Sequence, residues 1–556
     1  MKIIIGNEVK QNYFNNSVVK NENNYRFILN KNKKKTTKFI KNFNQQIKNY
    51  SIGGRFYKLV DDKLIFYRKN LARKLNQIHK VNFPLNYWGC LIDTFLLDLI
   101  AAIISDYDTF SQIKKRYRKT IYEYDEKEVQ VNETDNLFSE LYDLNFQKNF
   151  SAKAAEVLKI NIKKKNKIFE KIKFKKKNNF FSNIIKKFYI SIIYVLKPTL
   201  VDGSLLKLRY KFFDIKFIDK KIHLLVKTKF LQEHYEVKKD YNKRELLRID
   251  KVTDNIDKIF NELIKSYFPT SFLENFFKFK ASNEMIVKNC NSLILTSPFR
   301  TFDNIKIILA DLKYLKKKKT KILSHGPFEN LRKKSRSYDY CKKYSDQYFS
   351  FDKNRIIDHT IFNLSKFNKI DSKNKILIFS TVTRAFHNNN FFTSSHENHP
   401  FFSSDLKFYN CLNKKMKSIT YVKLFPSQKN SLNFTKAIWD KYILGNNRYL
   451  FKFNNFDKYH NFNLLVLNEV STPLLESIIS ERPFIVINFK SLINLNEELR
   501  KSLSKLKKFK LVFDDYKKAS KYVNRNIDEL LNNWHRIVKS KEFNELKKIT
   551  LKRNVD

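Results

Sequence analysis

The chain has 556 residues, of which 42% are hydrophobic and 15% aromatic, so it can form two or three packed domains and is not globally disordered. Its formal net charge of +55 would suit nucleic-acid binding. However, Lys, Asn, Ile, Phe and Tyr are all abundant while only 7 Gly and 9 Pro occur, which is the pattern that A/T-rich codons produce. We therefore interpret most lysines as scattered surface charge and expect no specific nucleic-acid partner. A basic face toward an anionic membrane or an acidic substrate is the alternative.

The four cysteines lie far apart and form no CxxC pair: Cys90, Cys290, Cys341 and Cys411. We therefore expect neither a zinc site nor a disulfide framework. The opening MKIIIG predicts a short strand and lacks the apolar length of a signal peptide. The longest apolar run, residues 90–105, contains two aspartates and is too short to span a bilayer, so it predicts a buried helix. These features predict a cytoplasmic protein, with peripheral contact with the inner membrane as a second option.

The first third of the chain, residues 1–187, is predicted to be an opening strand followed by a mainly helical region that belongs to the N-terminal domain. Residues 64–79 and 88–105 have the apolar spacing of helices, and the lysine-dense residues 150–187 predict a surface helix or arm. From 188 to 345 the pattern changes to strands (189–195, 293–296 and 321–324) with a helix at 303–314. This alternation predicts a parallel, Rossmann-like sheet.

The polar residues 346–374 are predicted to be a linker, and residues 375–556 a second Rossmann-like domain with terminal helices. Its expected strands and helices are short apolar runs in alternation: strands 375–379, 421–425, 449–453, 463–467, 483–488 and 511–513, and helices 405–415 and 472–480. The predicted fold class is therefore α/β, with two doubly wound domains.

Polar residues at strand ends are the candidate site residues, because open α/β sheets bind ligands beyond the carboxyl ends of their strands. His325 follows one strand, and Gly326 lets another backbone approach closely. Imidazole can act as a general base toward a hydroxyl or donate to a phosphate; the alternative is a capping or packing histidine.

The strand at 463–467 leads to Ser471 and Thr472, which are either an N-cap or a phosphate site at the positive end of a helix. Glu476 lies one helical turn further and could accept from ribose hydroxyls, or be a solvated helix residue. The strand at 375–379 leads to Thr381 and Arg384, where an arginine can pair with a diphosphate.

A third strand end, at 421–425, carries the cation Lys423. The remaining polar loop holds His387, His396 and His399 at a spacing that no standard metal site uses, so we expect no metal.

Several segments together resemble the transferases encoded in bacterial O-antigen and other surface-carbohydrate gene clusters. They are Leu75-Asn76-Gln77-Ile78-His79 with Tyr87-Trp88, Ser324-His325-Gly326, Ser345-Asp346-Gln347-Tyr348, Thr383-Arg384, Lys423 to Pro426, and Ser471-Thr472 with Glu476. The resemblance implies a B-type (GT-B-like) glycosyltransferase with two facing Rossmann-like domains. The acceptor would bind on the first domain and the nucleotide mainly on the second.

The resemblance also implies a function in surface-polysaccharide or lipopolysaccharide biosynthesis. A sugar, or a related polyol-phosphate unit, would pass from a nucleotide-activated donor to a glycan or lipid-linked acceptor, without a metal or a cofactor. His325 would be the catalytic residue, and the donor would be bound by Gly326, Thr381, Arg384, Lys423, Ser471, Thr472 and Glu476. Where that family has a glycine-rich run after His-Gly, this chain has Pro327-Phe328-Glu329-Asn330. A non-catalytic homologue that scaffolds glycan assembly is therefore an alternative, and a basic nucleic-acid-binding protein is another.

Overall fold

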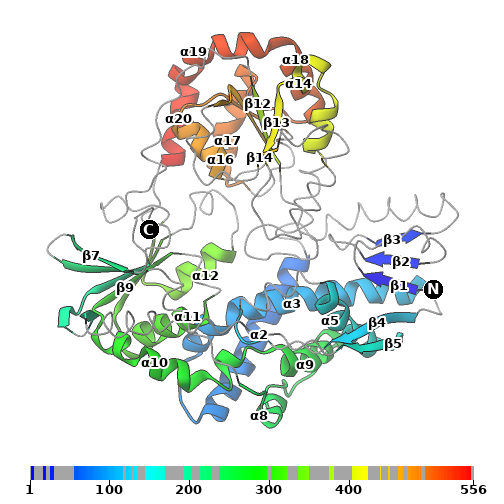
Figure 1. Cartoon of the computed structure of the whole chain (residues 1–556), viewed down its shortest axis with the longest axis vertical. Helices are drawn as coiled ribbons and strands as arrows, with labels where there is room; N and C mark the ends of the chain where they lie inside the picture. Colours follow the sequence, from blue (N-terminus) through cyan, green and yellow to red (C-terminus); the bar gives the residue numbers. More distant parts are fainter. Residues whose placement is uncertain are drawn as a thin grey trace. The chain divides into compact units, whose positions relative to one another are not determined.

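The computed structural model is a mixed α/β protein with three sheets (Figure 1). It describes residues 2–5, 17–20, 26–29, 55–116, 121–127, 131–134, 144–168, 192–193, 195–202, 213–218, 221–226, 237–296, 302–323, 336–349, 375–380, 404–423, 439, 449–450, 461–468, 472–487, 489 and 495–551. The chain divides into two compact units. Unit 1 comprises Met1–Leu323, Asp339–Tyr348 and Phe386–Asn390, and unit 2 comprises Ser324–Tyr338, Phe349–Ala385 and Phe391–Asp556.

The first sheet of unit 1 has the strand order β3-β2-β1-β4-β5. Its strands are β1 (Lys2–Ile5), β2 (Ser17–Lys20), β3 (Arg26–Leu29), β4 (Ile121–Lys127) and β5 (Asn161–Ile168). All pairs are parallel except β2 with β3. The predicted opening strand is therefore confirmed as β1, but it is the centre of a sheet that the sequence did not predict.

The lysine-dense residues 150–187 were predicted to form a helix or arm, and for the described residues this is only half correct. Helix α5 (Leu144–Val157) ends early, and β5 follows as a strand. The register opposes Glu123 to Lys163 and Glu126 to Lys167 across β4 and β5. Strand β5 pairs with β4, and this partner lies outside the local sequence pattern. The predicted strand at 189–195 is also wrong for its described residues, which are helical at 192–193 and 195.

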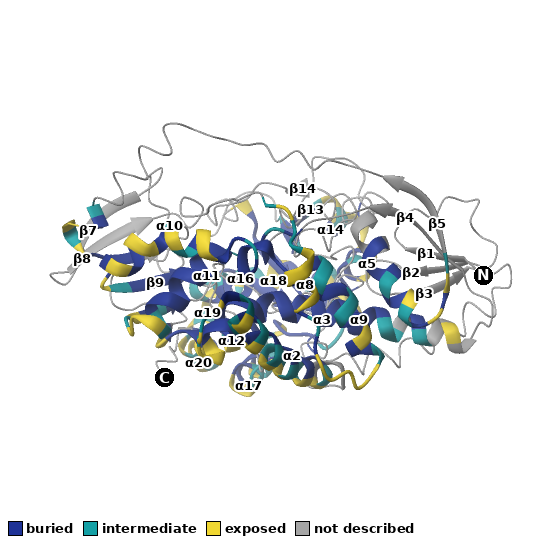
Figure 2. Ribbon diagram, turned by 90° about the horizontal axis from the view of Figure 1, so that it is seen from below, coloured by how far each residue is buried: buried dark blue, intermediate teal, exposed yellow. Residues whose placement is uncertain are grey.

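Two long helices form the core of unit 1. Helix α2 (Arg55–His79) packs against α3 (Leu85–Arg116), and α3 also contacts α5, α9 (Asn255–Tyr267) and α11 (Asp303–Ala310). The segment Leu85–Asp108 of α3 is apolar and long enough to cross a membrane. Its most apolar stretch, however, is entirely buried inside the protein (Figure 2). This burial supports the prediction of a core helix.

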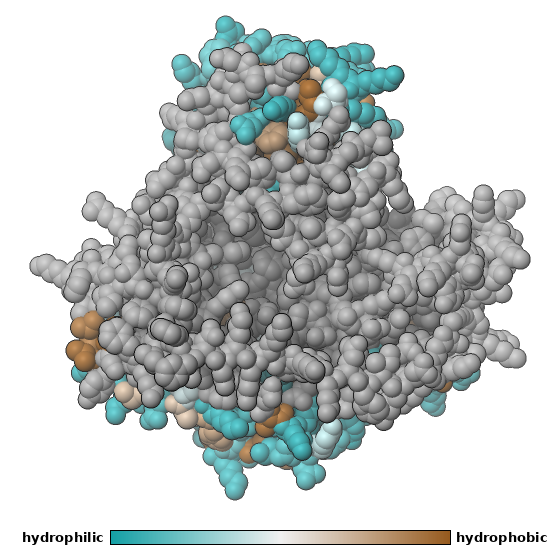
Figure 3. Space-filling model, in the orientation of Figure 1, coloured by the Kyte–Doolittle hydropathy of each residue, from teal (hydrophilic) through white to brown (hydrophobic). Residues whose placement is uncertain are grey.

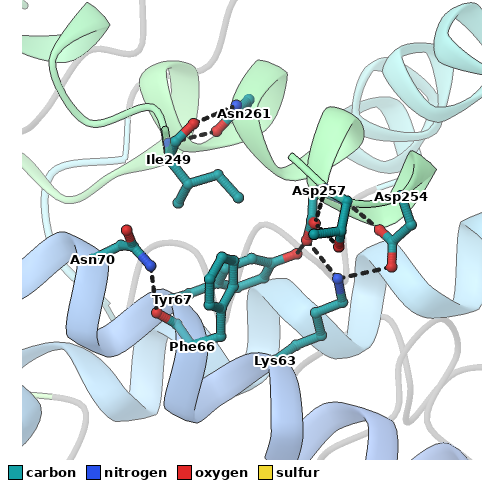
Figure 4. A network of polar contacts seen from close by, with 9 residues as sticks. Lys63, Phe66, Tyr67, Asn70, Ile249, Asp254, Asp257 and Asn261 are labelled. Atoms are coloured by element: carbon teal, nitrogen blue, oxygen red, sulfur yellow. Dashed lines mark hydrogen bonds and ion pairs between the residues drawn. The ribbon is translucent and has the colours of Figure 1, made fainter. Parts of the chain in front are cut away.

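A buried ion-pair network fastens α2 to α9 (Figure 4). Lys63 Nζ lies 2.5 Å from Asp257 Oδ1 and 2.8 Å from Asp254 Oδ2. Tyr67 donates its hydroxyl to the same Asp257 oxygen at 2.7 Å, and Thr253 donates to Asp257 Oδ2. Burial raises the pKa of Asp257, but the hydrogen bonds from Lys63 and Tyr67 outweigh burial and hold this pKa below its ordinary value. The network is thus a charged clamp between segments about 190 residues apart.

The second sheet of unit 1 has the order β11-β10-β9-β6-β8-β7. Its strands are β6 (Thr199–Asp202), β7 (Phe213–Ile218), β8 (Lys221–Val226), β9 (Ser292–Thr296), β10 (Lys319–Leu323) and β11 (Gln347–Phe349). The neighbours β8, β6, β9 and β10 are parallel, as predicted for this part of the chain. Strand β11 uses three residues of the segment 346–374 that the sequence analysis assigned to a linker. The domain boundaries of the sequence analysis stay predictions.

Shorter helices connect these strands. They are α8 (Tyr241–Glu245), the 3-10 turn η3 (Thr270–Phe272), α10 (Phe276–Asn289), the π-helical turn η5 (Asp311–Leu315) that continues α11, and α12 (Arg336–Tyr344). Helices α11 and η5 together confirm the predicted helix at 303–314.

Unit 2 contains a third sheet whose order is β14-β13-β12-β15-β16, with every pair parallel. The strands are β12 (Ile376–Phe379), β13 (Thr420–Lys423), β14 (Tyr449–Leu450), β15 (Leu464–Leu467) and β16 (Phe484–Val486). A parallel bridge from Val486 to Val512 continues the sheet beyond β16. Counted along the chain, this is the 3-2-1-4-5-6 order of a Rossmann-type sheet. Five of the six strands predicted for the last third are present, whereas residues 511–513 contribute a single parallel bridge at Val512 and no strand.

The helices of unit 2 are α14 (Lys414–Ser418), α16 (Thr472–Ile479), α17 (Glu497–Lys505), the 3-10 turn η10 (Leu506–Phe509), α18 (Tyr516–Asn532), α19 (Trp534–Lys539) and α20 (Lys541–Leu551). Their apolar faces pack with the strands into one core. In α18 a side-chain oxygen of Asp515 accepts from the backbone amides of Lys517 and Lys518, which caps the helix at its first turn. The terminal helices that the sequence predicted are therefore part of this core.

Candidate functional site at the carboxyl edge of the unit 2 sheet

The strand order of unit 2 fixes where a ligand would bind. Strand β13, the next strand along the chain, pairs with one side of β12, and β15 pairs with the other side. The strand order therefore reverses between β12 and β15. In open α/β sheets the crevice beyond the carboxyl ends at such a reversal is the usual ligand site. Ile378 pairs with Val466, so Ser380 and Asn468 leave the two strands at the same level.

Ser380 is held in place from two directions. Its backbone amide donates to the Lys423 carbonyl at 3.1 Å, which extends the β12–β13 ladder by one bond. Its hydroxyl accepts from Trp439 Nε1 at 2.9 Å, and the Trp439 indole is fully buried against Tyr409. The first polar residue after β12 is therefore part of a rigid edge.

Asn468 and Asp405 form the second polar pair at this edge. Asn468 Nδ2 donates to Asp405 Oδ1 at 2.9 Å, and both side chains are buried. Asp405 lies in the helical residues 404–410, so the contact joins the helix after β12 to the end of β15. This buried polar pair therefore fixes residues 404–410 against the end of β15.

Lys423 is the last residue of β13 and is 6% exposed. Burial lowers the pKa of its ammonium group to about 8, because the charged form loses hydration. An anion that binds beside this amine would favour its charged form and raise the pKa again. A buried lysine at a strand's carboxyl end is therefore suited to a phosphate.

The helix after β15 is α16, and Thr472 is its first residue, as the sequence predicted. The side chain of Thr472 lies outside the described residues, as do His325, Gly326, Thr381, Arg384 and Ser471, so their predicted roles stay predictions. Glu476 lies one turn into α16 and is half-buried. Of the predicted donor-binding residues, the structure thus places Lys423 at the end of β13 and Thr472 and Glu476 in α16, which follows β15; strand β12 lies between β13 and β15.

The N-terminal segment that resembles surface-carbohydrate transferases, residues 75–79 with 87–88, has a structural role in unit 1. Asn76 Oδ1 accepts from Trp88 Nε1 at 2.7 Å and from the Phe83 amide at 3.1 Å, so this side chain clamps the turn between α2 and α3. His79 stacks on Trp88, and its Nε2 lies 3.0 Å from the Phe272 carbonyl. Burial lowers the pKa of His79 to about 4, so the ring is neutral and donates to that carbonyl.

The Ser-Asp-x-Tyr segment is also structural. Asp346 accepts from the amide and hydroxyl of Thr320 at 2.8 and 3.0 Å and pairs with Lys313 at 3.0 Å. It therefore fixes the start of β10.

Sequence reasoning missed Asp405, Asn468 and Ser380 as site residues. Asn468 and Ser380 carried a usable signal, because each comes directly after an apolar strand run. Asp405 carried none, since only the tertiary structure brings residues 404–410 to the end of β15.

Comparison with known proteins identifies a protein family whose model spans nearly the whole chain. No curated protein matches. A solved structure from Listeria monocytogenes, of a protein assigned as a UDP-N-acetylglucosamine 2-epimerase, is 12% identical, with a TM-score of 0.30 over 52% of this chain and 80% of that chain. The model of the family described as LIC12162 family transferase matches residues 10–540. Because this match covers nearly the whole sequence, the chain belongs to the LIC12162 family of transferases.

Proposed function

We propose that this transferase moves a glycosyl unit, or a related polyol-phosphate unit, from a nucleotide-activated donor to a surface-polysaccharide precursor. The observation that carries the proposal is the reversal of strand order between β12 and β15, with Ser380, Lys423 and Asn468 at the carboxyl edge. Membership of a transferase family supports the reaction class. The resemblance to surface-carbohydrate transferases supports the acceptor class.

In this proposal the diphosphate lies between Lys423 and the first turn of α16, where the ammonium charge and free helix amides both favour an anion. Arg384, Ser471 and Thr472 complete the phosphate site. Glu476, which is half-buried in α16, accepts from hydroxyls of the ribose or sugar. Unit 1 holds the glycan or lipid-linked acceptor. His325 removes the proton from the acceptor hydroxyl.

Nucleotide binding tests the site directly. Calorimetric titration of the full chain with UDP, GDP, CDP and ADP should find one that binds. Replacing Lys423 by methionine should weaken that nucleotide about ten- to a hundredfold, because a charge-assisted phosphate contact is worth about 1.5–3 kcal/mol. The matched control is Lys407→Met, which removes an exposed lysine in the same unit. Equal affinity of the two variants would exclude Lys423 from the site.

The pH dependence provides a second readout. In the protein without nucleotide the Lys423 amine is mostly neutral above pH 8, so binding requires the uptake of a proton. Affinity of the wild type should therefore fall about fivefold from pH 8 to pH 9, and this fall should be absent in Lys423→Met. A fall of the same size in both proteins would assign the pH dependence to another group.

Transfer itself is tested with the sugar derivative of whichever nucleotide binds. His325→Ala should lower turnover about 10²–10⁴-fold while nucleotide binding is kept. Near-wild-type transfer by the folded variant would remove His325 from the mechanism. A wild type that binds the donor but transfers nothing to any glycan acceptor would point to a non-catalytic homologue.

A further inference from the structure

The amino edge of the second unit 1 sheet gathers three loops on one surface. Strands β6, β9 and β10 are parallel neighbours, and Thr199 and Lys319 both pair with Ser292, so the loops that precede them emerge at the same level. Two hydrogen bonds tie two of these loops together: Asn291 donates from its amide to the Pro198 carbonyl at 3.1 Å and from Nδ2 to the Lys197 carbonyl at 2.6 Å. This edge lies opposite the carboxyl ends, where α/β sheets bind small ligands.

Large apolar side chains are exposed at this edge. Val195 precedes β6 and is 72% exposed, and Leu315 precedes β10 and is 38% exposed. Because β9 alone separates the two strands, these loops are about 10 Å apart. Met285, also 38% exposed, lies in the last turn but one of α10, which ends just before β9 (Figure 2). Figure 3 shows brown apolar residues at separate points along the left and lower margins of unit 1, among hydrophilic ones.

Lysines surround these apolar side chains. Five of them are exposed in the same three loops or in the last turn of α10, and we call this surface the basic edge: Lys197, Lys288, Lys316, Lys317 and Lys319. The nearest acidic residues in sequence are Glu284, exposed on α10, and Asp311, which is buried and pairs with Lys280; the more distant Asp346 pairs with Lys313. The basic edge therefore keeps a net positive charge.

The mixture of lysine and aliphatic side chains distinguishes this surface from the described lysine-rich faces of unit 2. Among the described residues, every exposed large hydrophobic side chain belongs to unit 1. In unit 2, lysines of α17 and η10 are paired with carboxylates, as in Lys505–Glu545, Lys507–Asp514 and Lys508–Glu542. Codon composition explains scattered lysines, but it does not explain why unpaired lysines and exposed aliphatic residues occur together.

We propose that the basic edge docks on an anionic lipid bilayer. The lysine ammonium groups would bind lipid phosphates, and Val195 and Leu315 would enter the boundary between headgroups and acyl chains. Lysines near a membrane surface each contribute to adsorption, and aliphatic side chains gain from leaving water. A nucleic acid would use the lysines but gain little from Val195 and Leu315, since its backbone offers phosphates rather than an apolar layer. The proposal does not depend on the nucleotide site of unit 2.

Vesicle co-sedimentation of the full chain tests the proposal, with phosphatidylcholine vesicles prepared with and without phosphatidylglycerol. The test variant replaces Lys316, Lys317 and Lys319 by glutamine. The matched control replaces Lys517, Lys518 and Lys521, which are exposed in α18 of unit 2. Both variants lose the same charge, so the general attraction caused by the net charge of +55 falls equally. A third variant, Val195→Ser with Leu315→Ser, removes the apolar part.

We expect the wild type to bind vesicles that contain phosphatidylglycerol and to bind phosphatidylcholine alone far less. The triple change at the basic edge should weaken partitioning about a hundredfold, from about 1 kcal/mol for each lysine, and the control far less. The serine double variant should lose about tenfold. Equal losses in the two lysine variants would overturn the proposal. So would a triple variant that loses binding to a DNA duplex but keeps binding to vesicles. Circular dichroism of each variant verifies that it is folded.

Discussion

Replacing Lys423 by methionine should stabilise the protein at neutral pH although it weakens the proposed donor site. The ammonium group is 6% exposed, and burial lowers its pKa from 10.5 to about 8. That difference corresponds to about 3 kcal/mol against the charged form in the folded state. Methionine has a similar length and no charge, so the variant should recover up to about this amount of unfolding free energy at pH 7.

The direction in which the unfolding free energy changes with pH is the decisive test. Between pH 8 and 10.5 the unfolded chain still binds the proton that folded Lys423 has released, so the unfolding free energy of the wild type rises with pH across this window. The advantage of Lys423→Met should therefore be full at pH 7 and shrink by about 3 kcal/mol by pH 10.5. The effects of other lysines cancel because both proteins share them.

Urea unfolding followed by tryptophan fluorescence provides the assay, since Trp439 and Trp534 both lie in unit 2. Lys407→Met is the control, because an exposed lysine should give nearly the same unfolding free energy as the wild type at every pH. A Lys423→Met variant that is less stable at pH 7, or whose difference from the wild type does not change with pH, would refute the reasoning. Lower stability with the native lysine would show that the amine is kept for a task other than folding.

Three further changes test unit 1. Gly89→Ala should destabilise it by about 1–3 kcal/mol in thermal unfolding, because the new Cβ would lie 2.3 Å from the Tyr344 hydroxyl, which is buried; Gly89→Ala with Tyr344→Phe should recover part of the loss. Asp257→Ala should cost about 1–3 kcal/mol, because the buried Tyr67 hydroxyl loses its acceptor and Lys63 keeps only the partly exposed Asp254; a loss below about 1 kcal/mol in urea unfolding would contradict a charged clamp. Acidification should destabilise the wild type through His79, whose unfolded pKa of 6.5 lies above its folded value of about 4, so that stability falls as pH falls across this window. His79→Phe should remove up to about 3 kcal/mol of that loss, and an unchanged acid profile would show that another group is responsible.

The basic edge and the nucleotide site lie on different units and are addressed by different variants. The glutamine variants at Lys316, Lys317 and Lys319 should leave nucleotide affinity unchanged, whereas Lys423→Met should leave vesicle binding unchanged. Separate losses would establish two independent surfaces on this transferase.

The sequence alone determined the strands of unit 2. Buried parallel strands are covered on both faces, so they read as continuous apolar runs, as in Leu464–Leu467, where every residue is buried. The same reasoning placed Lys423 and Thr472 at ends of these elements. Helical spacing likewise predicted α2 and the core of α3, because one apolar stripe every 3.6 residues is a local property of the chain.

Only the tertiary structure decided the rest, because the interactions join residues that are distant in sequence. Strand β5 is rich in lysine and becomes a strand beside β4, whose glutamates oppose its lysines in the register. Asp405 reaches the site through Asn468, 63 residues away, and no local pattern marks that meeting. The low pKa of Lys423 also depends on the residues that bury it. Local sequence thus set which segments are strands or helices, while long-range packing set which polar groups are buried together and therefore what the site can bind.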